Sequence, residues 1–282
     1  MDLGWLAAPL TGKEAQYNTS SLYIYRQSDL IISTCRLVQS RTDVRLGCLG
    51  EVATRPDFRR QGLARKLCQH AADDFERGQG KALFLATENP SPARQLYSAL
   101  GWKPVAGSNA MVRLPGTLSV DRFLSDYFHE GSSLPVRIVR GSPQFRVTMI
   151  PLILVPHDWM TLDRNAAITS TRYAVQPSCE GLYGRYALLN IPAAWFAAVR
   201  ADGVVAGLSS AKRTTGREFC VDGFAHNLYE DACLKPLYQE VIHWAREQDC
   251  EAVCTACART DYNKETALRT HLSDELPEIK YF

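Results

Sequence analysis

The residues whose types most clearly suggest a binding or reactive role lie in a short turn between an apolar segment and a helical one. Arg59, Arg60 and Gly62 follow the apolar run that ends at Thr54, and from Leu63 onward apolar residues recur at four-residue spacing, which predicts a helix. The first N–H groups of a helix have no partner within it and lie at the positive end of its dipole. A glycine lets a ligand approach this backbone closely. The turn therefore predicts an anion site, most simply for a phosphate.

This turn matches neither of the two common phosphate-binding loops. It lacks the Gly-Lys-Ser/Thr end of the P-loop and the three glycines of the dinucleotide-binding loop. A solvated helix start would also explain two consecutive arginines. Gly62 beside them favours the phosphate interpretation.

A second motif follows a run at 82–87 that is predicted to be a buried strand. Its positions are Asn89, Ala93, Leu96, Tyr97, Gly101 and Trp102. Because the usual pKa of a phenol is about 10, Tyr97 is protonated at neutral pH. Its place on a predicted helix is also consistent with ordinary packing. Asn89 has a second interpretation as the cap of a helix that begins near Pro90.

Together the two motifs resemble the core of the GNAT superfamily of N-acetyltransferases. The family's acyl-CoA motif, Arg/Gln-x-x-Gly-x-Gly/Ala, is matched by Arg59, Gly62 and Ala64, with Pro56 upstream. Its later segment, Asn-x-x-x-Ala-x-x-Leu-Tyr-x-x-x-Gly-Trp/Phe, is matched by the second motif. The resemblance covers roughly residues 22–114 and implies an α/β fold with a mixed sheet.

The resemblance also implies acetyl-CoA as co-substrate and assigns residues to its parts. The pyrophosphate would meet Arg59 and the backbone of Arg60, Gln61, Gly62, Leu63 and Ala64. The pantetheine arm and the acetyl carbonyl would meet the edge groups of Val52, Ala53 and Thr54, and Asn89 would contact the pantetheine.

Two residues are implied as proton carriers. Tyr97 would protonate the departing sulfur. Glu51 lies on the strand that splays at the cofactor, where the family often places a carboxylate, and would act as general base. A salt-bridged or solvated strand residue is an equal alternative for Glu51.

Apolar runs and turns predict the elements that must position these groups. The first part of the chain should contain strands at 22–26, 30–38, 44–54, 82–87 and 110–114, the helix after Gly62, and a helix at 92–100. After a break at 115–117 we predict a helix at 118–130 and strands at 136–139, 145–155, 195–200 and 204–210. The segment 1–20 is too short to supply the helices that cover the acceptor side in the family, so we expect another part of the chain to cover it.

The second half of the chain repeats features of the first. One constant shift along the sequence relates Arg26 to Arg200, Asn89 to Asn263 and Ala93 to Ala267. We therefore predict two tandem GNAT-like units, a catalytic one at 1–115 and a degenerate one at 116–282 that packs on it and completes the acceptor pocket. At this shift the phosphate motif becomes Cys233, Pro236 and Tyr238, without a glycine and with a proline that lacks a backbone donor.

The composition limits which cellular compartment and which classes of binding partner we expect. The chain has 282 residues, 46% hydrophobic and 22% charged, and a net charge of +2, too small to favour a nucleic acid or a membrane surface. No apolar run approaches the length of about 20 residues that spans a bilayer. Nine scattered cysteines favour reduced thiols and a cytoplasmic protein. Cys254 and Cys257 have metal-ligand spacing but no second pair, so we expect buried thiols and no metal.

The leading hypothesis is an acetyl-CoA-dependent N-acetyltransferase that acts on a primary amine of a small molecule by direct attack on the thioester. Its alternatives are a non-catalytic acyl-CoA-binding sensor, an acetyltransferase for a protein amine, and an acyl-thioester hydrolase. The sequence leaves the acceptor, the acyl chain length and the oligomeric state open, so an oligomer is possible.

Overall fold

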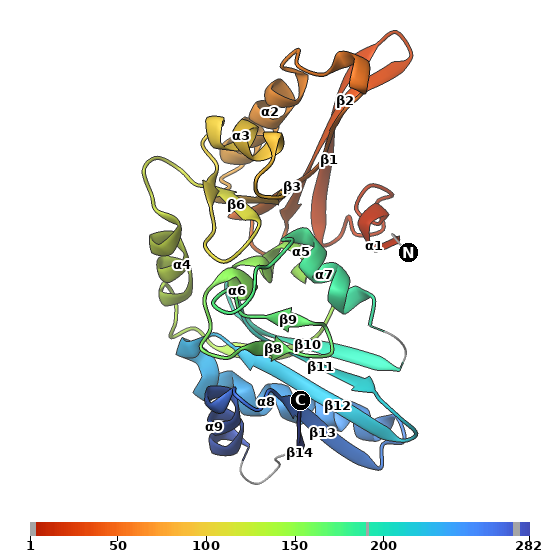
Figure 1. Cartoon of the computed structure of the whole chain (residues 1–282), viewed down its shortest axis with the longest axis vertical. Coiled ribbons are helices and arrows are strands. Elements are labelled where there is room, and N and C mark those ends of the chain that lie inside the picture. The colour runs from red at the N-terminus through yellow and green to blue at the C-terminus, as the bar shows by residue number, and fades with distance from the viewer. Residues whose placement is uncertain (1–3, 190–191, 273–276) are drawn as a thin grey trace. The chain divides into compact units, whose positions relative to one another are not determined.

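The computed structural model describes residues 4–189, 192–272 and 277–282 (Figure 1). The chain divides into two compact units. The first comprises Met1–Phe123, Pro143–Thr148 and Pro177–Tyr183, and the second comprises Leu124–Ser142, Met149–Gln176 and Gly184–Phe282. Two helices, α4 (Val120–His129) and α7 (Glu180–Ala187), cross the division. The sequence places its boundary at 115, whereas the first compact unit extends to Phe123 and takes in two later segments.

The first unit is built on a six-stranded mixed sheet of order β1-β2-β3-β4-β6-β5. Its strands are β1 (Asn18–Gln27), β2 (Leu30–Ser40), β3 (Leu46–Thr54), β4 (Ala82–Ala86), β5 (Lys103–Pro104) and β6 (Ala110–Arg113). Its helices are α1 (Gly4–Ala7), the 3-10 turn η1 (Pro56–Phe58), α2 (Leu63–Arg77), α3 (Pro92–Ala99) and α5 (Phe145–Thr148). Strands β1 to β3 form an antiparallel meander, and β4 pairs parallel to β3.

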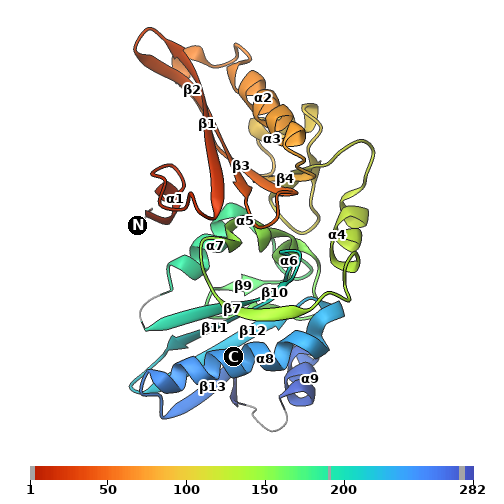
Figure 2. The ribbon, with the colours of Figure 1, turned by 180° about the vertical axis from the view of Figure 1, so that it is seen from behind.

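Helix α2, orange in Figure 2, covers one face of this sheet. Leu67, Ala71 and Phe75 are buried at four-residue spacing and pack with Leu37 and Leu49 of the sheet. Because side chains alternate along a strand, the neighbours of these strand residues point to the opposite face. That face is contacted by α5, which arrives from much later in the chain.

The sequence predicts a strand at 145–155, and this prediction is wrong. The segment forms two short helices, α5 (Phe145–Thr148) and α6 (Ile150–Leu154), and all their residues are buried. A short run that is apolar throughout carries no period, so it does not distinguish a buried strand from a buried helix. Pro151 lies in the first turn of α6, where its missing N–H costs no helical hydrogen bond.

The second unit contains another six-stranded mixed sheet, of order β14-β13-β12-β11-β10-β7. Its strands are β7 (Val136–Arg140), β10 (Ala193–Arg200), β11 (Val205–Arg213), β12 (Glu218–Ala225), β13 (Ala252–Cys257) and β14 (Glu278–Tyr281), with a separate pair of β8 (Thr161–Asp163) and β9 (Ile168–Thr169). Its helical elements include α6, the 3-10 turn η2 (Asn227–Tyr229), α8 (Glu230–Glu247) and α9 (Tyr262–His271). The strands predicted at 136–139, 195–200 and 204–210 and the helix predicted at 118–130 are confirmed.

The second unit repeats the order of the first: an antiparallel hairpin, a third strand, a 3-10 turn, a long helix, a parallel strand and a shorter helix. This confirms the tandem arrangement. The uniform shift is wrong, however, because α3 begins at Pro92 and α9 at Tyr262, a smaller separation than that of Asn89 and Asn263. Asn263 therefore lies inside α9, whereas Asn89 precedes α3, and the two are not equivalent.

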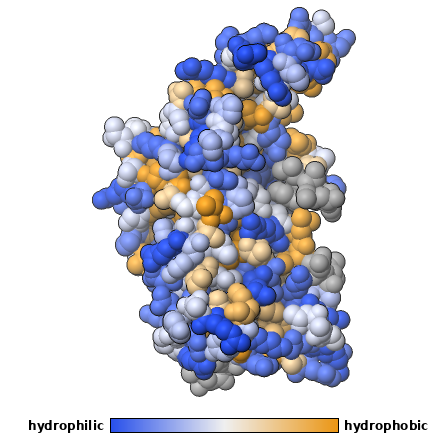
Figure 3. Space-filling view, in the orientation of Figure 1, coloured by the Kyte–Doolittle hydropathy of each residue, from blue (hydrophilic) through white to orange (hydrophobic). Residues whose placement is uncertain are grey.

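The surface and the thiols agree with the composition. On the face shown in Figure 3, hydrophobic residues form small separate groups among hydrophilic ones. In the ranges that the structure describes, no helix has the length and apolarity needed to cross a bilayer. Cys254 and Cys257 are buried on β13, as predicted. Over the same ranges, no group of three or more metal-ligating side chains is found.

Candidate active site

The predicted phosphate turn lies between η1 and α2 and spans Arg59 to Gly62. Gly62 is the N-cap residue of α2 with a φ of +77°, and no side chain caps the helix. A Cβ atom at Gly62 would meet nothing within 4 Å, so the approach to the backbone is open. The first turn of α2 contains no acidic residue. Arg59 donates from Nε to the carbonyl oxygen of Thr54 at 3.1 Å, which ties the turn to the end of β3.

A bulge interrupts β3 just before this turn. The register between β2 and β3 shifts between Thr34 and Arg36, and Glu51 has a φ of +44°. The hydroxyl of Thr34 donates to the carbonyl oxygen of Glu51 at 2.8 Å. The parallel pairing of β3 with β4 extends only from Leu46 to Cys48, so beyond Cys48 the two strands are no longer paired. This end of β3 carries most of the residues predicted to meet the pantetheine arm.

A cavity of about 680 Å³ lies between the end of β3, the turn and α3. Nine predicted residues line it: Val52, Ala53, Thr54, Arg59, Arg60, Gly62, Leu63, Ala64 and Tyr97. Other lining residues were not predicted as binding residues: Phe58, Arg65, Ser91, Pro92, Ala93 and Leu96. The structure thus brings both motifs to one cavity within the first unit. Three predicted residues, Glu51, Gln61 and Asn89, do not line it.

Tyr97 reaches the cavity from α3. Its side chain is 6% exposed, and its ring lies 5.9 Å from that of Trp102. Burial raises the pKa of the Tyr97 hydroxyl well above its usual value, with the nearby thiols of Cys68 and Cys35 acting in the same direction. The phenol therefore stays protonated at neutral pH.

Glu51 belongs to a group of buried charges on the face of the sheet opposite α2. Its carboxylate pairs with Nε of Arg36, which is fully buried, whereas the Glu51 side chain is 30% exposed. Nη2 of Arg36 also donates to both carboxylate oxygens of Glu180, at 2.8 and 2.7 Å. Burial lowers the pKa of Arg36, but the two carboxylates outweigh burial and raise it overall. Neither Arg36 nor Glu180 was identified from the sequence, and Glu180 is 144 residues away from Arg36.

Asn89 does not cap the helix that follows it. The N-cap residue of α3 is Ser91, whose hydroxyl accepts a hydrogen bond from the backbone N–H of Arg94 at 3.1 Å. Asn89 is exposed and precedes this cap. The capping interpretation of Asn89 is therefore wrong, and its contact with pantetheine stays a prediction.

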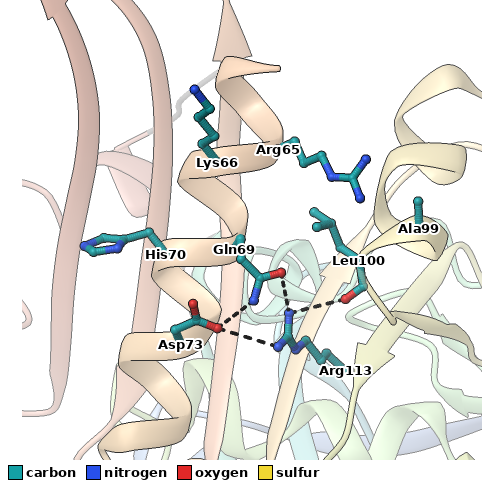
Figure 4. A pocket seen from close by; sticks show the side chains of 8 residues that line it. All are labelled: Arg65, Lys66, Gln69, His70, Asp73, Ala99, Leu100 and Arg113. Atoms are coloured by element: carbon teal, nitrogen blue, oxygen red, sulfur yellow. Dashed lines mark hydrogen bonds and ion pairs between the residues drawn. The ribbon is translucent and has the colours of Figure 1, made fainter. Parts of the chain in front are cut away.

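A second cavity, of about 690 Å³, lies on the outer side of α2 (Figure 4). Arg113 extends into it and donates from Nη1 to Gln69 at 3.4 Å and to the carbonyl oxygen of Leu100 at 3.3 Å. The Gln69 amide in turn donates to Asp73 at 2.6 Å. Arg65 lines both cavities, so both lie beside the start of α2. No predicted site residue lines this second cavity.

The corresponding turn in the second unit is built differently. Helix α8 begins at Glu230, directly after η2, and its first turn contains Glu230 and Asp231. Strand β12 has a continuous register with β11, without a bulge. Asp222 on β12 is fully buried and accepts from Nζ of Lys264 at 2.7 and 2.9 Å. The carboxylate of Asp222 on this third strand is therefore closed off from solvent.

Comparison with known protein families found a match over the part of the chain that contains both motifs. Residues 18–104 match the family model described as an acetyltransferase (GNAT) domain. That match contains every residue predicted for the site. No curated protein matches the chain.

Several solved structures are similar to parts of the chain. A tandem GNAT protein from the clavulanic acid biosynthesis pathway is 14% identical, over 83% of this chain and 73% of its own, with a TM-score of 0.29. The ribosomal-protein-S18-alanine N-acetyltransferase of Escherichia coli is 20% identical, over 40% and 79%, with a TM-score of 0.31. A GNAT family acetyltransferase from Elizabethkingia anophelis, solved with acetyl-CoA bound, is 21% identical, over 33% of this chain, with a TM-score of 0.28. The chain spans 60% of the length of this last protein.

Proposed function

We infer that a GNAT acetyltransferase domain, matched over residues 18–104, makes this protein an acetyl-CoA-dependent N-acetyltransferase. The observation that carries the proposal is one cavity of about 680 Å³ lined by residues of both motifs. Binding alone would not require a buried, protonated phenol at its wall. Tyr97 therefore favours an enzyme over a sensor that only binds acyl-CoA.

The residues present fit the phosphate-bearing part of acetyl-CoA. Gly62 leaves the helix start open, no side chain caps it, and no carboxylate lies in the first turn of α2. An anion there is stabilised both by the unpaired N–H groups and by the helix dipole. Arg59 and Arg60 line the same cavity and add positive charge. We propose that the backbone from Arg60 to Ala64 binds the pyrophosphate.

Acetyl-CoA, when bound, supplies the acetyl thioester that the acceptor amine attacks. Val52, Ala53 and Thr54 line the cavity at the unpaired end of β3, and we propose that their backbone orients the pantetheine arm and the acetyl carbonyl. Tyr97 would hold a proton at its hydroxyl and give it to the leaving sulfur. Glu51 would accept the proton of the amine, directly or through water, while Arg36 holds its carboxylate.

We propose a small-molecule amine as the acceptor, in a cytoplasmic protein. The segments 143–148 and 177–183 belong to the first compact unit, and α5, within the first of them, contacts β2 and β3 on the sheet face beside Glu51. A covered face favours a small acceptor over an extended peptide. An acetyltransferase for a protein amine is the alternative.

Two measurements test the proposal. Titration calorimetry with acetyl-CoA should show one site per chain at micromolar to millimolar concentration, and no binding at millimolar acetyl-CoA would overturn it. A panel of primary amines with a free-thiol readout should then give turnover for at least one amine above the rate without acceptor. Binding without turnover for small amines and for lysine peptides would instead support the sensor.

A further inference from the structure

The charges around Glu51 form a continuous chain within the first unit. Arg36 pairs with Glu51 and Glu180; Glu180 accepts from Nη1 of Arg146 at 3.2 Å; and Arg146 donates to both oxygens of Glu14, at 2.7 and 2.6 Å. Both arginines are fully buried, and the signs alternate along the chain. Each charge therefore has a partner of opposite sign, as buried charges require.

Among the members of this chain, Glu51 is the one next in sequence to a cavity-lining residue, although it does not line the cavity itself. It is the most exposed of the five side chains, and its neighbour Val52 lines the cavity. Its left-handed φ is uncommon for a residue with a side chain, and such a conformation persists only when its surroundings hold it. Two groups do so: the hydroxyl of Thr34 at its carbonyl oxygen and the guanidinium of Arg36 at its carboxylate.

Arg36 can hold Glu51 in one direction only if its own plane is fixed. A guanidinium presents its donors in a rigid planar fork. Glu180 accepts two hydrogen bonds from Nη2 of Arg36, and this fixes the direction in which Nε points. A Cβ added at Gly50 would lie 3.4 Å from Oε2 of Glu180 and 3.7 Å from Nη2 of Arg36, in ordinary van der Waals contact, so this ion pair lies directly beside the bulge.

We propose that Arg36 and Glu180 are positioning residues for acetyl transfer, which hold the carboxylate and the bulged backbone of Glu51 at the edge of the cavity. This rests on the proposed function. It assigns a role in the reaction to residue 180, which lies outside the matched GNAT segment at 18–104. The proposal also explains why the segment 177–183 belongs to the first compact unit.

The test compares two substitutions in the same chain of charges. Glu180→Gln removes the charge that fixes Arg36 and keeps the shape of the side chain. Glu14→Gln is the matched control, because Glu14 is also buried and pairs with Arg146 but does not pair with Arg36. Thermal unfolding of both variants measures the stability effect that they share.

Glu180→Gln should lower kcat about tenfold and leave the acetyl-CoA dissociation constant within about twofold, since the cavity lining is intact. Glu14→Gln should leave kcat within about twofold. Arg36→Lys, which keeps the charge but lacks the rigid planar fork of donors, should resemble Glu180→Gln. Hydrogen exchange gives a readout besides activity: the amides at 50–53 should exchange about tenfold faster in Glu180→Gln and not in Glu14→Gln.

Equal effects of Glu180→Gln and Glu14→Gln on kcat and on exchange at 50–53 would show that the chain of charges only stabilises the fold, and would overturn the inference. A wild-type kcat in Glu180→Gln would also overturn it. Either result leaves the proposed function standing. A wild-type protein that binds no acetyl-CoA would instead remove the proposed function, and this inference with it.

Discussion

The starts of the two long helices differ, although α2 and α8 follow the same order of strands in their units. Helix α2 begins after a loop that ends at Gly62 and has no acidic residue in its first turn, whereas α8 begins directly after η2 with Glu230 and Asp231. In α8 the protein's own carboxylates meet the positive end of the dipole. In α2 that end is open. The same architecture therefore has a helix start without acidic residues in one unit and a helix start with two acidic residues in the other.

The third strands of the two units, β3 and β12, also differ. In β3 the bulge contains the partly exposed Glu51, whose neighbour Val52 lines a cavity, and in β12 the continuous strand holds Asp222 in a fully buried pair with Lys264. Arg36 and Ser210 occupy matching positions on the adjacent strands, opposite Gly50 and Asp222. At the position of Gly50 the second unit therefore has a buried and paired carboxylate, whereas the first unit carries its carboxylate one residue later, at the partly exposed Glu51.

The strongest test of this contrast removes the buried cation of the second unit. Lys264→Met should destabilise the second unit by roughly 3–5 kcal/mol, because it leaves the charge of Asp222 buried without its partner. Lys280→Met is the control, since Lys280 pairs with Glu218 at the surface and its loss should leave the unfolding midpoint nearly unchanged. Denaturant unfolding measures both. A wild-type midpoint for Lys264→Met would contradict the structural role of the pair.

The pH dependence of the unfolding free energy is a second test of the buried charges in the second unit. Burial, together with repulsion from Asp222, raises the pKa of Asp163 from 3.8 to about 6. Because the pKa of Asp163 is higher in the folded state than in the unfolded state, the folded state binds the proton more tightly. The group therefore stabilises the fold fully below pH 3.8, and this contribution, about 3 kcal/mol, is lost as the pH rises to about 6. Asp163→Asn should remove this fall from the curve of unfolding free energy between pH 4 and 6. Parallel curves for the two proteins would rule out the assignment.

The acid role of Tyr97 is tested in the first unit. Tyr97→Phe should lower kcat about 10²-fold, the usual contribution of a general acid, and leave acetyl-CoA affinity unchanged because the ring still packs against Trp102. Tyr25→Phe is the control, since Tyr25 packs on the same core but does not line the cavity. Because burial raises the pKa of Tyr97, its titration should cause no loss of kcat below about pH 10. An unchanged kcat in Tyr97→Phe would assign the residue to packing.

The smallest expected effect concerns the open helix start. Gly62→Val should weaken acetyl-CoA binding about tenfold, equivalent to about 1.4 kcal/mol, because the new side chain projects where the anion would lie. Gly12→Val is a closely matched control: Gly12 has a φ of +76°, against +77° for Gly62, and also has no atom within 4 Å of an added Cβ. Both variants should lose similar stability. Equal acetyl-CoA affinities would contradict the role of Gly62.

Local patterns predicted the first unit well. The motif of Gly62 and the motif of Tyr97 are each contiguous, so turn chemistry and helical periodicity were enough to place both, and the structure brings them to one cavity. The pairing of Arg36 with Glu180 was beyond such reasoning, because residues 144 apart carry no local signal of their contact. The helices α5 and α6 were also not predicted, because the apolar run that forms them has no hydrophobic periodicity.

The repeat was detected, but its spacing was misjudged for a physical reason. The shift that takes the hairpin residue Arg26 to Arg200 is slightly larger than the shift that takes the cap Ser91 to the cap Asp261. The difference is close to one helical turn of about 3.6 residues, so it returns buried residues of α2 to buried residues of α8. Apolar matches on a helix therefore could not reveal that the second unit is shorter at this point.

The order in which the chain leaves the ribosome gives the buried pair of Arg36 a further consequence. The guanidinium is synthesised 144 residues before the carboxylate of Glu180. Until that later segment emerges, Arg36 has only the carboxylate of Glu51 as a partner, and the sheet face that carries this pair lacks the later segments that cover it, so we expect this face to complete its packing only after residue 183. A gene shortened to end at codon 115 would encode both motifs and yet express a domain in which this face and its ion pair stay uncovered.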